Sequence, residues 1–154
     1  MAAVAFRKNQ QEVPHSSLVW LETMAIPHHL QEIPGATELH DWFGHWPTFH
    51  DAEVISLHLN RQGTSALRVH TWETTNQVDT EGCYILTKHV VVEFLVDSVS
   101  NCVLGAFNHQ NVISGLAVEK TDSGYRLILS ERYGLTGSID LGSIRIRITP
   151  GKPS

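Results

Sequence analysis

The stretch from Leu39 to Asn60, LHDWFGHWPTFHDAEVISLHLN, changes its hydrophobic period halfway along, and this change predicts the fold. Its first part places large apolar side chains at the helical spacing i, i+3, i+4 and i+7. These residues are Leu39, Trp42, Phe43 and Trp46. Its second part alternates apolar and polar residues, as a half-buried strand does. The alternating apolar residues are Ile55, Leu57 and Leu59. We therefore expect one short helix over about 36–44, followed by a strand.

Short apolar segments continue to the end of the chain, separated by turn residues. Further strands are expected at 66–72, 88–97, 111–120, 125–130, 135–140 and 143–149. The polar segment 73–82, ETTNQVDTEG, is predicted to be a long loop. The connections are too short for helical crossovers, which excludes a parallel sheet. The sequence thus predicts a mostly β member of the α+β class, with antiparallel sheet(s) of seven or eight strands and one short N-terminal helix packed on the core.

The length and composition fit one globular domain. The chain has 154 residues, of which 42% are hydrophobic and 18% charged, so it can fill a core. We expect a single α+β domain over residues 34–150. Residues 1–33 are predicted to be an N-terminal extension, partly flexible or forming one short helix, for which 16–25 has suitable apolar spacing.

Several classes of protein are disfavoured by composition. The net charge of −5 argues against a dedicated nucleic-acid binder, which needs a basic surface. No apolar run is long enough to span a bilayer, so we expect no membrane insertion. Cys83 and Cys102 have neither metal-site nor CxxC spacing, and no secretory signal is evident. A cytoplasmic protein with free thiols is the expectation.

Histidine is unusually frequent, and its distribution is uneven. The chain has 10 histidines, and no Lys or Arg lies between Lys8 and Arg61. That interval holds seven carboxylates and seven histidines, so it is acidic at neutral pH and becomes less so as the histidines protonate. It predicts either a dipolar surface that favours solubility or an acidic face for a basic partner.

The histidines invite a test for a metal site or a catalytic site. His40, His45 and His50 are five residues apart, and five residues turn about 500° on a helix, so neighbours in this series cannot share an ion there. A site assembled from these three and Asp51, with a distant histidine added, stays open. His50 and Asp51 could also act as an acid/base pair, although Asp51 equally suits a turn that leads into a strand. No nucleophile motif accompanies them, so we expect neither catalytic residues nor a cofactor.

The aromatic residues of the same segment have two interpretations. They are either part of the core or, with the neighbouring acids and histidines, a binding surface of the kind found at the centre of protein interfaces. The candidate partner-binding residues are Asp41, Trp42, His45, Trp46, His50, Asp51, Glu53 and Trp72.

The segment 43–61, FGHWPTFHDAEVISLHLNR, resembles the WPxFHDAEV signature of the immunity-protein-50-like family. The stretches 111–116 and 133–139 are also similar, and the resemblance spans about residues 33–150. These small bacterial proteins are assigned as antidotes in polymorphic toxin systems. The resemblance implies a non-enzymatic cytoplasmic immunity protein that occludes the active site of a cognate toxin, one that we expect to be basic. The alternatives are a metal- or small-ligand-binding module, or an enzyme, built on residues 40–58. Self-association into a homo-oligomer through an edge strand also stays open.

Overall fold

The computed structural model describes residues 25–154. In this part of the chain a single 8-stranded antiparallel sheet has the order β4-β7-β6-β5-β1-β2-β3-β8. The strands are β1 (Ala52–His58), β2 (Ser65–Val78), β3 (Tyr84–Asp97), β4 (Asn101–Gly105), β5 (Val112–Thr121), β6 (Gly124–Tyr133), β7 (Thr136–Leu141) and β8 (Ser143–Pro150). A 3-10 turn, η1 (His28–Leu30), and the helix α2 (Ala36–Phe43) precede them. The predicted mostly-β fold with one short helix is confirmed.

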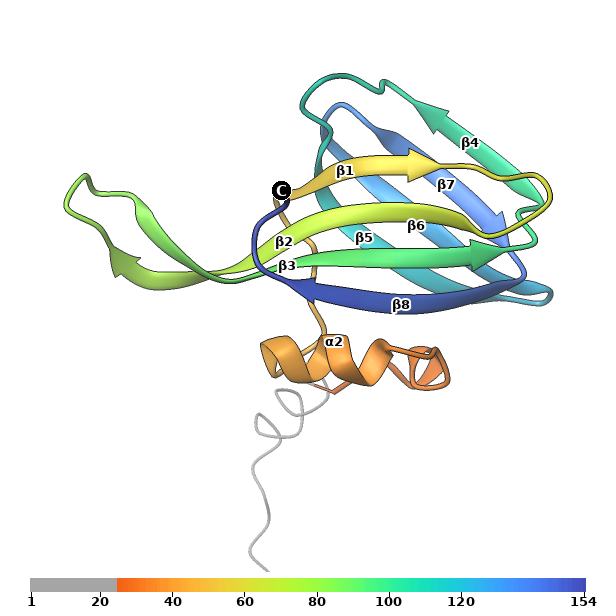
Figure 1. Cartoon of the computed structure of the whole chain (residues 1–154), viewed down its shortest axis with the longest axis horizontal. Coiled ribbons are helices and arrows are strands. Elements are labelled where there is room, and N and C mark those ends of the chain that lie inside the picture. Colours follow the sequence, from red (N-terminus) through yellow and green to blue (C-terminus); the bar gives the residue numbers. More distant parts are fainter. Residues whose placement is uncertain (1–24) are drawn as a thin grey trace, which may run out of the picture.

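The sheet folds over on itself, so that its two halves face each other (Figure 1). Strands β1, β2, β3 and β8 form the front layer, and β5, β6 and β7 lie behind them. The bend is at the contact between β1 and β5, where only two residue pairs are in register, Ala52 with Ile113 and Glu53 with Val112. A single sheet can therefore enclose a core as two layers do.

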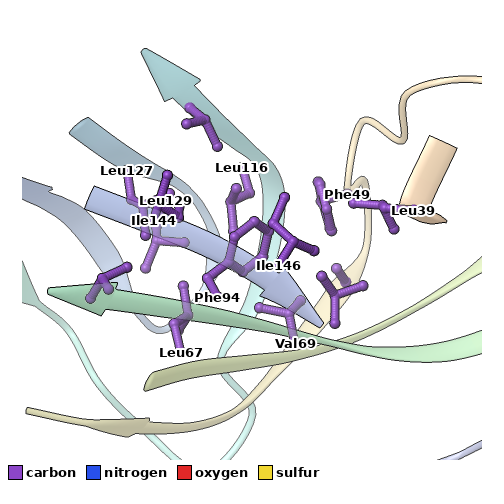
Figure 2. Close-up of a cluster of buried hydrophobic side chains, with 14 of the residues drawn as sticks. Leu39, Phe49, Leu67, Val69, Phe94, Leu116, Leu127, Leu129, Ile144 and Ile146 are labelled. Atoms are coloured by element: carbon purple, nitrogen blue, oxygen red, sulfur yellow. The ribbon is translucent and has the colours of Figure 1, made fainter. Parts of the chain in front are cut away.

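The core lies between these two halves (Figure 2). Leu67 on β2 and Phe94 on β3 point toward Leu127 on β6, and all three side chains are fully buried. On β8 the predicted alternation is confirmed, because Ile144 and Ile146 are buried whereas the arginines between and after them are exposed. Apolar burial on both inner faces supplies the main stabilisation of the fold.

Helix α2 lies where the sequence predicts it, between two glycines in the left-handed conformation. Gly35 has φ +88° and Gly44 has φ +79°, a conformation that glycine adopts without steric cost. Leu39 and Phe43 are buried in the core, one helical turn apart. Just before the helix, the Pro34 carbonyl accepts a 2.7 Å hydrogen bond from the Ile146 amide on β8. The helix is thereby fastened to the last strand.

The described part of the predicted extension belongs to the same body. Leu30 and Ile33, which the predicted boundary leaves outside the domain, are buried in the core cluster. His29 Nε2 lies 2.8 Å from the carbonyl oxygen of Val118 on β5, so this segment spans from β5 toward β8. The helix predicted over 16–25 lies, apart from its last residue, outside the described residues. Neither helix of the described part is long and apolar enough to cross a membrane.

Strand β1 begins with the opposite phase from the predicted one. Val54 is buried and Ile55 is exposed, whereas Leu57 packs partly against the core. The cause is a bulge: Val54 pairs with Val69 and Ser56 with Arg68, so Ile55 is an extra residue without a partner. The alternation of apolar and polar residues can be read from the sequence, but one inserted residue changes which of them face the core.

The predicted loop at 73–82 is wrong. Strand β2 continues to Val78, β3 starts at Tyr84, and the two form a hairpin that projects beyond the sheet (Figure 1, left). Its turn is closed by Asp79, whose Oδ1 accepts hydrogen bonds from the amides of Glu81 and Cys83, both at 2.9 Å. We call residues 74–86 the arm. The hairpin is not predicted from its polar, threonine-rich sequence, because apolar and polar residues alternate only weakly there.

Candidate functional site

The FHDAEV segment, residues 49–54, forms a corner where the chain enters β1. Its backbone is unusual, because Phe49 has φ +59° and Asp51 has φ +62°, and the Ala52 amide donates to the Phe49 carbonyl at 3.1 Å. Bulky residues rarely adopt this conformation, so the surrounding contacts must hold it in place. The ring of Phe49 is buried against Phe94, with centroids 5.7 Å apart.

The motif divides into an inner and an outer set of side chains. Its apolar residues Phe49, Ala52 and Val54 are buried in the core. Its polar residues His50, Asp51 and Glu53 point outward and remain partly exposed. The apolar half of the signature therefore fixes the corner, and the polar half is what another molecule can reach.

Asp51 links the start of β1 to the end of β6. Its Oδ1 lies 2.6 Å from Arg132 Nη1, and its Oδ2 lies 3.1 Å from His50 Nδ1. His50 Nε2 is in turn 3.4 Å from the same Arg132 nitrogen. The predicted His50–Asp51 contact exists, but Arg132 neutralises the carboxylate, which suits a partly exposed ion pair better than general base catalysis.

Four of the predicted binding residues line one open hollow of about 310 Å³. They are His45, His50, Asp51 and Trp72. Glu73, at the base of the arm, also lines it, as do several threonines. The structure therefore brings half of the predicted set together, beside the root of the arm.

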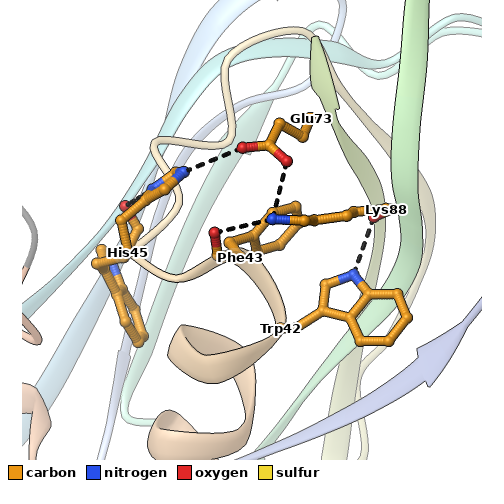
Figure 3. Close-up of polar contacts among 6 residues, drawn as sticks. Trp42, Phe43, His45, Glu73 and Lys88 are labelled. Carbon is orange, nitrogen blue, oxygen red and sulfur yellow. Dashed lines mark hydrogen bonds and ion pairs between the residues drawn. The ribbon is translucent and has the colours of Figure 1, made fainter. Parts of the chain in front are cut away.

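A network of polar contacts fastens α2 to the root of the arm (Figure 3). Lys88 Nζ lies 2.9 Å from Glu73 Oε2 and donates to the carbonyl of Phe43, the last residue of α2, at 3.2 Å. A cation at this position offsets the partial negative charge of a helix C-terminus. Glu73 Oε1 is 3.9 Å from His45 Nε2, so one carboxylate contacts both partners.

The other predicted residues lie elsewhere. The Trp42 indole donates to the Lys88 carbonyl at 2.9 Å, so this ring joins α2 to β3. Trp46 lines a different hollow with Leu116 and Val118 of β5. Asp41 is on the solvent side of α2, beside His40. The eight predicted residues thus do not form one continuous binding surface.

Glu53 belongs to a chain of polar contacts on the outer face of the sheet. Its Oε2 is 2.9 Å from His70 Nδ1, and His70 Nε2 is 3.1 Å from His89 Nδ1. The His70 side chain is only 7% exposed. The planes of the two imidazole rings are within 19° of parallel and their centroids are 5.3 Å apart, and the tautomers decide which of the two facing nitrogens donates to the other. Trp72 packs against both rings.

The electrostatics of this chain of contacts favour a neutral His89. Burial lowers the pKa of His89 below its ordinary value, and the positive charge of Lys152 and the neighbouring His70 lower it further. Glu53 and the Leu86 carbonyl act in the opposite direction, with smaller effects. His89 is therefore uncharged at neutral pH.

The residues of the alternative metal site, His40, His45, His50 and Asp51, do not converge. Within residues 25–154, no group of three or more His, Cys, Asp or Glu side chains is placed to hold a metal ion.

Sequence reasoning missed Glu73, Lys88, Arg132 and the pairing of His70 with His89. A correct prediction of the β2–β3 hairpin would have placed Glu73 opposite Thr87, next to Lys88. No sequence signal pairs Arg132 with Asp51, because β1 and β6 are separated by β5 in the sheet. Comparison with protein-family models, with curated proteins and with solved structures found no match for the chain.

Proposed function

We propose that the chain is a non-enzymatic binding protein, an immunity protein that neutralises a cognate bacterial toxin by covering a basic active site. The observation that carries the proposal is the arm, an exposed hairpin that joins apolar side chains to negative charge. The resemblance of residues 43–61 to the immunity-protein signature supports the same role.

The arm exposes apolar side chains that the fold itself leaves uncovered. Every residue from 76 to 86 is exposed, and Tyr84 and Val78 are 65% and 55% exposed. An isolated two-stranded hairpin gains little stability in water, and exposed apolar clusters on such elements commonly mark interaction sites. A tyrosine on a hydrogen-bonded hairpin is also a favourable anchor, because it loses little conformational entropy on binding.

The charge of the arm indicates the sign of the partner. Between Glu73 and Lys88 the only charged residues are Asp79 and Glu81, both at the tip. Lys88 itself is held by Glu73 and α2. A basic surface around a toxin active site would complement the negative charge of this tip and accelerate association of the two proteins.

The hollow at the root of the arm extends the proposed surface. It brings Trp72, His45 and Glu73 next to the hairpin, in an orientation fixed by the Lys88 contacts. Tight immunity complexes need rigid surfaces, since ordering a mobile segment lowers affinity. We propose the cytoplasm as the site of action, where the thiols of Cys83 and Cys102, free in the structure, would remain reduced.

Co-expression with the product of any toxin-like reading frame that neighbours the gene tests the proposal. The expected result is rescue of growth and a stoichiometric complex that survives size-exclusion chromatography. Substitution of Tyr84 by serine should weaken this complex about 30-fold, the effect of removing an anchor worth about 2 kcal/mol.

Two charge reversals, one on the arm and one on a distant turn, test the role of the negative charge. Glu81→Lys should slow association with the toxin, and the effect should shrink as the salt concentration rises. The turn should remain intact, because Glu81 takes part in closing it only through its backbone amide. Asp122→Lys makes the same change in charge on the exposed β5–β6 turn and should leave binding unchanged. Absence of both rescue and complex with the unaltered chain would refute the immunity function.

A further inference from the structure

The two edges of the sheet are treated differently by the fold. At the β8 edge, the Ile146 amide donates to the Pro34 carbonyl, and α2 packs alongside. The outward-facing Arg145 and Arg147 add charge there. Covering elements and charges are the usual means by which proteins prevent an edge strand from pairing with another chain.

Among residues 25–154, the β4 edge has none of these protections. No charged residue and no proline occurs from 98 to 118, the segment that contains β4 (Asn101–Gly105). In the described part of the chain, β4 pairs with β7 on one side only, and it lies at the upper margin of the fold in Figure 1. Its central residue, Val103, is 61% exposed.

Apolar surface continues from this edge into the following turn. Phe107 is 70% exposed, the most exposed large apolar side chain of the described residues. Beside it lies an open hollow of about 380 Å³ lined by Leu57, Leu104, Ala106 and Leu135. We call Val103, Phe107 and this hollow the neutral edge.

We propose that the neutral edge is a self-association surface, on which β4 pairs antiparallel with β4 of a second copy across a two-fold axis. Antiparallel pairing of two identical strands satisfies a two-fold axis by construction, so each copy contributes the same donors, acceptors and apolar groups. The sheet then continues across the interface into the second copy.

Charge separates this surface from the arm. Two copies of the neutral edge meet without like-charge repulsion, whereas two arms would bring Asp79 and Glu81 of each copy together. The same argument favours a second copy over a highly charged partner at β4, because the surface offers no charge to complement one. The self-association does not depend on the proposed immunity function.

Sedimentation velocity of the full chain, over a micromolar to millimolar concentration series, tests the proposal. The unaltered chain should sediment as a dimer. Val103→Lys puts two like charges into one interface and should raise the dissociation constant at least about 100-fold. The matched control is Val78→Lys, the same substitution at an exposed valine of the arm, which should leave the dimer intact.

Amide hydrogen exchange locates the interface independently. Residues 101–105 should be protected in the dimer and should exchange faster in Val103→Lys, whose circular dichroism should match that of the unaltered chain. Phe107→Ser, in the adjoining turn, provides a second variant and should also weaken the dimer. A monomer at every concentration would overturn the proposal. A dimer broken by Val78→Lys but not by Val103→Lys would do so too, since it would place the interface on the arm.

Discussion

The two glycines that flank α2 allow the docking of the helix to be tested by a matched pair of substitutions. Gly35 and Gly44 have similar left-handed backbones, with φ +88° and +79°. A Cβ at Gly35 would lie 1.8 Å from the carbonyl oxygen of Ile146, whereas a Cβ at Gly44 would meet nothing within 4 Å. Alanine at either position is strained, but only at Gly35 must two backbone segments move apart.

The magnitudes follow from these contacts. Left-handed strain alone predicts a loss of about 1–2 kcal/mol for Gly44→Ala. Gly35→Ala should have the same strain and should also lose the Pro34–Ile146 hydrogen bond, worth about 1 kcal/mol, and expose part of Leu39 and Phe43. The expected loss of unfolding free energy is then about 3–5 kcal/mol in all. This is a large fraction of the stability of a typical domain.

Urea unfolding followed by tryptophan fluorescence measures both free energies. Trp42 and Trp46, on α2 and just after it, report the docking of this segment. The dependence of the unfolding free energy on urea concentration should be similar in both variants if both have the same native fold. Equal losses for Gly35→Ala and Gly44→Ala would show that α2 is not held against β8 as described.

Three further predictions concern single side chains. Because burial lowers the pKa of His89, the unfolded chain takes up its proton at a higher pH than the folded one; stability should therefore fall as pH drops from about 7 to about 5, and His89→Asn should reduce that dependence in urea titrations. Cys83 is exposed while burial raises the pKa of the Cys102 thiol, so a thiol reagent should modify Cys83 first, as peptide mass mapping would show. Arg132→Ala should cost no more than about 1 kcal/mol of unfolding free energy, since the pair with Asp51 is partly exposed; a loss of several kcal/mol would mean that this pair holds the corner.

The parts of the fold that could be predicted are those whose signals are local. The helix over 36–44 follows from apolar spacing and a terminal glycine, and β8 follows from three alternating isoleucines. The arm was missed because its strands bury almost nothing, so their sequence carries no hydrophobic period. The phase of β1 was wrong because a bulge depends on the partner strand as well as on the strand itself.

The candidate site was predictable only in part, for a similar reason. Four predicted residues meet at the hollow because the corner at 49–54 and the root of the arm come together in space. The polar contacts around the site join segments that are apart in the sequence, as Glu73 with Lys88 and Asp51 with Arg132 do. Periodicity reports which side of an element is buried, but not which element lies opposite.

The hydrogen bond between Pro34 and Ile146 has a consequence for how the chain folds. It joins residues more than a hundred positions apart, and β8 pairs with β3 across a long intervening segment. Such high contact order implies slow folding, in milliseconds to seconds, because much chain entropy is lost before these contacts form. During synthesis α2 emerges early and can contact β3 once that strand is made, but its contacts with β8 cannot form until the last strand leaves the ribosome. The docking of α2 is therefore completed only when the last strand of the sheet has been made.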